Sequence, residues 1–174
     1  MSQELFTLAN FTHSLQYFAG NITFTALTKK LASPNIHVGL AVGDEIFVAG
    51  SVSNNGIKTI VTVGTNEITV AETVTDEGAV ACTVNEQSST KFLRVEWYGL
   101  IVGTLYASQN ANLYVEWSHD GSITAITDTT ALVGGVAAKI EDRMIVTPYV
   151  KITLRNNGTD QTLVATHLYA KCWD

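Results

Sequence analysis

The chain is made largely of short runs in which apolar and polar residues alternate, each closed by a turn of Gly, Asn or Asp. Glu45-Ile46-Phe47-Val48 is one such run, and Ile57 to Val63 is another that follows the turn Asn54-Asn55-Gly56. Alternation places successive side chains on opposite faces of a strand, and Asn and Gly adopt the positive φ angles that tight hairpins need. The repeated pattern predicts a protein built from short antiparallel strands.

The residue types in these runs support the same prediction. Of the 174 residues, 53 are β-branched (23 Thr, 18 Val and 12 Ile), and only two are Pro. Branched side chains lose rotamer freedom in a helix and pack well on a pleated sheet. The chain is also 46% hydrophobic and only 15% charged, which is too apolar for a disordered protein. We therefore expect an all-β fold with a substantial core.

The runs fall into blocks that suggest a domain organisation. We expect an N-terminal arm at 1–20, a small β-barrel-like module at 21–84, and a jelly-roll or immunoglobulin-like β-sandwich at 91–174. The first block has short strands and tight turns, whereas the strands of the second are longer and more aromatic. Residues 85–90 contain no apolar side chain, which is typical of a linker.

The N-terminal segment gives a mixed signal. Apolar residues recur there at spacings of three and four, which suits one face of a helix, but its threonines and aromatic residues favour extended structure. We interpret it as an arm, with room for a short helix, that is dispensable for folding. Its aromatic side chains must be buried either on their own domain or on a partner subunit. Those side chains are Phe6, Phe11, Tyr17 and Phe18.

Two further aromatic pairs lie in the second block. Trp97 and Trp117 share a strand face with Leu and Val residues, so the alternation predicts that both are in the core. Tyr98 and Tyr114 fall on the opposite, more polar face, where they could line a subunit or ligand interface. Together with the aromatic residues of the arm, they complete the set of candidate partner-binding residues.

The sequence contains no convincing catalytic, cofactor or metal site. Ser118-His119-Asp120 has the residue types of a nucleophilic triad, but triad members converge from distant positions, so a turn is the better interpretation. Cys82 and Cys172 lie far apart, without clustered His, and are interpreted as buried reduced thiols. Phosphate-binding glycine motifs and calcium loops are absent from the sequence. We do not expect an enzyme, a cofactor or a bound metal.

Charge and hydropathy limit the partners further. The net charge is −6, whereas a nucleic-acid-binding protein needs a basic surface. No apolar run approaches the 18 residues of a membrane-spanning helix, and no signal peptide is visible. We therefore expect neither nucleic-acid nor membrane binding, and folding in a reducing cytoplasm.

Two stretches of the sequence resemble parts of tailed-bacteriophage proteins. Residues 22–80 are similar to a small β module of phage and prophage proteins, and residues 104–170 to the β-sandwich of phage virion proteins. The first similarity lies in Ile22-Thr23-Phe24, Gly43-Asp44-Glu45-Ile46, Val48-Ala49-Gly50-Ser51, Asn54-Asn55-Gly56, Ile68-Thr69-Val70 and Glu77. The second lies in Gly103-Thr104-Leu105-Tyr106, Val115-Glu116-Trp117-Ser118, Pro148-Tyr149-Val150-Lys151-Ile152, Arg155-Asn156-Asn157-Gly158 and Gln161-Thr162.

The resemblance implies a structural protein of the virion, in the first place a capsid decoration (cement) protein. Such a protein would bind the major capsid protein or other virion proteins, brace the shell without catalysing a reaction, and form a homotrimer. Two alternatives stay open. One is a tail or baseplate adaptor or a fibre component, and the other is a carbohydrate-binding module that uses Tyr98 and Tyr114.

Overall fold

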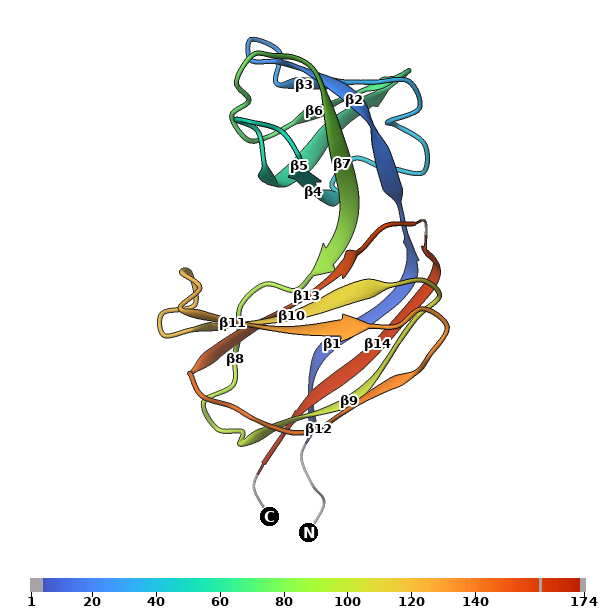
Figure 1. The fold of residues 1–174 in the computed structure, drawn as a ribbon. Coiled ribbons are helices and arrows are strands. Elements are labelled where there is room, and N and C mark those ends of the chain that lie inside the picture. Colours follow the sequence, from blue (N-terminus) through green and yellow to red (C-terminus); the bar gives the residue numbers. More distant parts are fainter. Residues whose placement is uncertain (1–4, 160, 173–174) are drawn as a thin grey trace.

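A computed structural model of the chain describes residues 5–159 and 161–172, and every regular element in these ranges is a β-strand. The predicted all-β fold is therefore confirmed. The strands form two bodies, a small barrel and a larger sandwich, and the barrel lies above the sandwich in the view of Figure 1.

The smaller body is a closed barrel of six antiparallel strands. Pairing runs in a ring from β2 to β3, β6, β5, β4 and β7, and β7 pairs again with β2. Its interior is filled by one apolar cluster that includes Ile22, Phe24, Ile46 and Ile68. Closure leaves no free sheet edge, so a small core is protected on all sides. The strands are β2 (Tyr17–Thr25), β3 (Lys30–Ala32), β4 (Glu45–Ala49), β5 (Gly56–Gly64), β6 (Glu67–Val70) and β7 (Glu77–Ser89).

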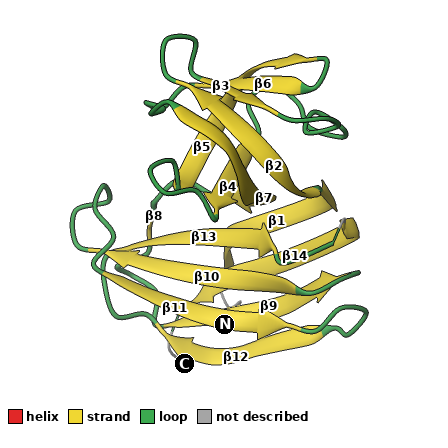
Figure 2. Ribbon diagram, turned by 45° about the horizontal axis from the view of Figure 1, so that its top comes forward, coloured by secondary structure: helices red, strands yellow, loops and turns green. Residues whose placement is uncertain are grey.

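The larger body is a sandwich of two sheets (Figure 2). One sheet has the order β1-β14-β9-β12, and the other has the order β11-β10-β13, with β8 paired to the outer side of β13. A single core takes side chains from both sheets, and Trp117 is its largest fully buried side chain. The strands are β1 (Leu5–Leu15), β8 (Leu93–Arg94), β9 (Leu100–Ala107), β10 (Ala111–Ser118), β11 (Ile126–Leu132), β12 (Ala138–Met144), β13 (Tyr149–Asn156) and β14 (Gln161–Lys171).

The barrel is inserted between the first and second strands of the sandwich. The chain forms β1 in the sandwich, leaves to build the whole barrel from β2 to β7, and returns for β8 to β14. The sandwich is therefore not confined to the block at 91–174, because it takes its first strand from residues 5–15. The chain crosses between the two bodies twice, once where β1 leads into β2 and once where β7 ends beside β13. These two crossings lie close together, because β2 and β7 are paired strands.

The predicted N-terminal arm is also wrong for the described residues. Residues 5–15 are β1, which pairs along its length with β14 and buries Leu8, Ala9 and Leu15 in the sandwich core. The pairing has a register shift between Thr7 and Ala9, where two successive side chains are buried. A β-bulge of this kind interrupts the two-residue period, and here it produces the helix-like spacing of the apolar residues. A segment with three core residues is not dispensable for folding.

The predicted linker at 85–90 is likewise part of the fold. Residues 85–89 belong to β7, and Glu86 and Gln87 are both buried. Polar residues can occupy a buried strand when each finds a hydrogen-bond partner. Here the partners, Gln16, Glu45 and Arg155, come from distant parts of the chain, which composition alone does not reveal.

Candidate functional site: the junction and an apolar end

The barrel and the sandwich are held together by a clamp around Arg155 of β13. Its guanidinium lies 3.8 Å from the ring centre of Phe47 on β4 and 4.7 Å from that of Tyr114 on β10. One ring belongs to the barrel and the other to the sandwich, so a single cation bridges both bodies. Burial lowers the pKa of Arg155, while Tyr114 and Glu116 raise it. Arginine stays protonated in proteins, so the clamp keeps its charge.

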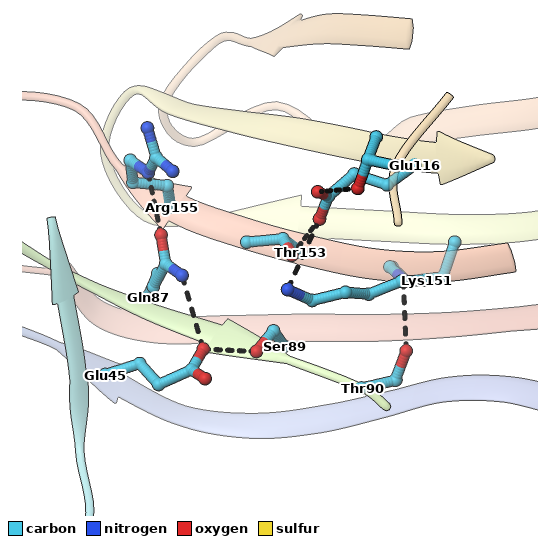
Figure 3. A network of polar contacts seen from close by, with 10 residues as sticks. Glu45, Gln87, Ser89, Thr90, Glu116, Lys151, Thr153 and Arg155 are labelled. Carbon is cyan, nitrogen blue, oxygen red and sulfur yellow. Dashed lines mark hydrogen bonds and ion pairs between the residues drawn. The ribbon is translucent and has the colours of Figure 1, made fainter. Parts of the chain in front are cut away.

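A chain of polar contacts continues from this arginine into the barrel (Figure 3). Arg155 Nε donates a hydrogen bond of 2.9 Å to Gln87 Oε1, and Gln87 Nε2 donates one of 3.2 Å to Glu45 Oε2. The Ser89 hydroxyl donates to the same carboxylate oxygen. Gln87 is 3% exposed, so removal of either partner leaves a buried amide group without its hydrogen bond.

A buried carboxyl group, Glu86, lies at the second crossing. The backbone amide of Gln16 donates to Glu86 Oε2 at 2.6 Å, and the backbone amide of Glu86 donates to the backbone carbonyl of Gln16 at 3.0 Å. The side chain is 8% exposed. Burial raises the pKa of Glu86 to about 7, the hydrogen bond from Gln16 opposes this, and the charge of Asp44 adds to it. This carboxyl group therefore titrates near neutral pH.

A cleft of about 740 Å³ opens between the two bodies beside this carboxyl group. Its walls come from β1, from the loop that precedes β4, and from the end of β7 with the residues after it. The charged residues that line it are Asp44, Glu45, Glu86 and Lys91. Within the described ranges, no three His, Cys, Asp or Glu side chains are grouped as a metal site requires.

The structure shows Ser118-His119-Asp120 as a turn. The buried Ser118 Oγ accepts the amides of Asp120 and Gly121 at 3.3 and 3.0 Å and donates to Asp120 Oδ1 at 3.0 Å. Asp120 Oδ1 also accepts the amides of Ser122 and Ile123, and these bonds lower its pKa. The His119 side chain is exposed and takes no part in this network.

This arrangement predicts a structural effect at Ser118 and none at His119. Ser118→Ala removes the buried hydroxyl that accepts hydrogen bonds from two backbone amides, so we expect a loss of about 1 kcal/mol in the free energy of unfolding. His119→Ala should change it by less than about 0.5 kcal/mol. Urea denaturation of both variants tests this, and an equal effect at the two positions would contradict the assignment.

A second polar hub fixes the loop that leads into β5, and it is built from residues of the phage-like pattern. Glu77 accepts hydrogen bonds from Ser51 Oγ at 2.6 Å, the Val52 amide at 2.9 Å and Asn54 Nδ2 at 2.9 Å. These bonds, with the Ser51 hydroxyl the largest cause, lower the pKa of Glu77. The pattern Gly-Ser, Asn-Asn-Gly and a final acidic residue therefore has a structural role in the barrel.

Glu77→Gln is expected to destabilise the barrel in a pH-dependent way. A carboxylate with a lowered pKa stabilises the fold above its ordinary pKa of 4.5, and this contribution is lost as the pH falls. The melting temperature of Glu77→Gln should therefore lie below that of the wild type at pH 7, and the gap should narrow towards pH 3. A gap that stays constant over this range would contradict the role of the ionised group.

The six predicted partner-binding aromatic residues do not form one site. Phe6 and Tyr98 stack on one another, with ring centres 5.7 Å apart. Phe11 also packs against the sandwich core, and Phe18 packs against the barrel core. Tyr17 borders a small hollow of about 50 Å³ beside the barrel loop, and Tyr114 lies under Arg155. Of this set, Phe6 and Tyr98 are in ring contact with one another, and Phe11 packs against the same core cluster.

The sequence prediction missed an apolar end of the sandwich. Trp97 was expected in the core, but its side chain is 80% exposed, because the chain turns after Val95 with a hydrogen bond from the Tyr98 amide to the Val95 carbonyl. Pairing places Leu5, Lys171, Leu100 and Met144 in one row across the same end. We call the end of the sandwich where β10, β12 and β14 finish and β1, β9, β11 and β13 begin the apolar end. The exposed apolar residues in or next to these strand ends are Leu5, Trp97, Ile123, Ile126, Met144 and Val146.

No known family model matches this chain, and no curated protein is similar to it in sequence. The site must therefore be interpreted from its own geometry.

Two further features of the described residues bear on the sequence predictions. Cys82 and Cys172 are both free, and Cys82 is buried as predicted, whereas Cys172 is only partly covered. In the part of the chain that the structure describes, no helix has the length and apolarity of a membrane-spanning segment.

Proposed function

We propose that this protein is a structural subunit of a bacteriophage virion, most simply a capsid decoration protein that binds and braces the shell of major capsid protein. The observation that carries the proposal is the strand order of the sandwich. The two sheets read β1-β14-β9-β12 and β8-β13-β10-β11, and successive strands change sheet at every connection except that from β10 to β11.

We infer from this order that the sandwich is a jelly roll. Eight strands in two sheets of four, with connections that cross between the sheets, suit this topology, which viral capsid proteins use widely. An immunoglobulin-like sandwich of the constant type has seven strands divided four and three, which fits the order less well. One fold can serve many functions, so the decisive test detects this chain in the virion itself.

The apolar end provides a surface for the proposed partner. Exposed apolar side chains gathered on one region of a protein commonly mark a protein–protein contact. Trp97 is the largest of them, and tryptophan often contributes much of the binding energy at such contacts. In this proposal the apolar end faces the major capsid protein, and the barrel projects from the shell.

The carbohydrate-binding alternative fits the geometry less well. Jelly rolls also occur in lectins, but the two tyrosines proposed for stacking are engaged within the chain. Tyr98 stacks on Phe6, and Tyr114 is covered by Arg155. Neither ring is free to form a platform for a sugar.

Counting copies per particle tests the proposal. Phage particles that carry a tagged copy of this chain would be purified and analysed by quantitative mass spectrometry against the major capsid protein. Hundreds of copies support a decoration protein, whereas a dozen or fewer indicate a tail component. Absence from the particles would contradict a virion role. Light scattering of the purified protein tests the trimer, which should have three times the 18.8 kDa mass of the chain.

Trp97→Ser is expected to weaken particle binding at least tenfold while the fold is unchanged. The indole is exposed, so its loss should alter the free energy of unfolding by less than about 0.5 kcal/mol. Val133→Ser is the matched control, since Val133 is 65% exposed but follows β11 at the opposite end of the sandwich. Co-sedimentation with particles measures the effect, and equal binding by the two variants would argue against the apolar end as the contact.

A further inference from the structure

We propose that the junction between the barrel and the sandwich is a pH-sensitive hinge, in which loss of the Glu86 proton opens the cleft between the two bodies.

The position of Glu86 at the crossing makes it suitable as a latch. It lies on β7, and it pairs through both backbone and side chain with Gln16, the residue that connects β1 to β2. The two crossings are thus fastened to one another at this pair. Apart from the Gln16 amide, no hydrogen-bond donor reaches this carboxyl group among the described residues. Burial costs a carboxylate that accepts only one hydrogen bond much more solvation free energy than it costs the neutral acid.

The charges around Glu86 favour opening when it ionises. Asp44, from the loop before β4, and Glu45, on β4, line the same cleft from the barrel side. Lys91, which follows β7, lines the cleft as well. Arg155 on β13 is occupied by Gln87 and the two rings, so it is not free to neutralise Glu86. Ionised Glu86 is therefore repelled by the charge of Asp44, and a wider cleft reduces this repulsion by admitting more water.

The Arg155 clamp keeps the two bodies attached during this movement. Its guanidinium does not titrate near neutral pH, and its two ring contacts do not depend on the protonation of Glu86. The pairing of β7 with β13 at Gln87 and Ser88 also persists. The expected movement is therefore a rotation of the barrel about this point, without separation of the two bodies.

The experiment follows the full-length protein from pH 5.5 to pH 8.5 with two measurements. The amide signal of Gln16 in a ¹H–¹⁵N spectrum reports the latch, and the radius of gyration from small-angle X-ray scattering reports the cleft. Both should change together with a midpoint near pH 7, and the radius should be larger at high pH. In Glu86→Gln neither should titrate, because glutamine mimics the neutral acid.

Two further variants test whether the charge of Asp44 sets the midpoint. Asp44→Asn removes a charge that favours the neutral form of Glu86, so both midpoints should move to lower pH. Glu67→Gln removes a carboxylate that is ion-paired to Lys30 on the barrel surface, and it should leave both midpoints unchanged. If the Gln16 signal titrates while the radius of gyration stays constant, the junction is rigid and the hinge is refuted. A titration that persists in Glu86→Gln would also overturn the proposal.

Discussion

Arg155→Ala is expected to lower the free energy of unfolding by about 3 kcal/mol and to uncouple the barrel from the sandwich. A desolvated cation over an aromatic ring contributes about 2 kcal/mol, and a hydrogen bond from a charged group contributes about 1.5 kcal/mol or more. Arg155 makes two cation–π contacts, to Phe47 and Tyr114, and one hydrogen bond, to Gln87. Because neighbouring contacts are not additive, the expected total is below the sum.

Calorimetry and guanidinium denaturation measure both effects. The wild type should unfold in one transition, since the two bodies share β7 and the clamp. In Arg155→Ala the barrel and sandwich should unfold separately. Arg155→Lys should recover only part of the loss, because an ammonium group keeps the charge but lacks the planar surface that stacks between the rings.

A surface arginine is the matched control for this prediction. Arg94 forms an ion pair of 2.6 Å with Glu96, and its side chain is 62% exposed. Exposed pairs contribute little, so Arg94→Ala should change the free energy of unfolding by less than about 1 kcal/mol. If Arg94→Ala and Arg155→Ala had equal effects, or if Arg155→Ala kept a single transition at wild-type stability, the clamp would be refuted.

The barrel was largely predictable because its signals are local. The run from Glu45 forms β4, and the residues after Asn54-Asn55 form β5, as the turn chemistry predicts. Both strands alternate between barrel interior and surface for part of their length. Tight turns fix the register of neighbouring strands, so short-range patterns are sufficient for a small antiparallel barrel.

The junction could not be predicted in the same way, because its stability comes from contacts between distant residues. Gln87 is 68 residues from Arg155 in sequence, and Glu86 is 70 residues from Gln16. Read locally, these polar residues indicate a linker. The bulge in β1 similarly concealed a core strand, and a turn after Val95 removed Trp97 from the face that alternation assigned to it. In each case tertiary contacts, which the local sequence pattern does not contain, determined the structure that the segment adopts.

Glu86→Gln is expected to stabilise the protein at alkaline pH and to have little effect at acidic pH. The pKa of Glu86 is raised from 4.5 to about 7 in the folded chain. A carboxyl group with a raised pKa holds its proton more tightly in the folded state, so the wild type loses stability as the pH rises between these values. At about 1.36 kcal/mol per pKa unit, the cost at pH 8 is about 3 kcal/mol.

The measurement is the difference in the free energy of unfolding between Glu86→Gln and the wild type, taken from urea denaturation at pH 5, 6, 7 and 8. Taking the difference cancels the contributions of Glu77 and Asp120, whose lowered pKa values act in the opposite direction. The gap should grow with pH and level off above pH 7. Opening of the junction gives the carboxylate access to water, so the hinge predicts a plateau lower than the cost in the closed state. A gap that is independent of pH would show that Glu86 is ionised in the folded protein throughout, and it would contradict both the raised pKa and the hinge.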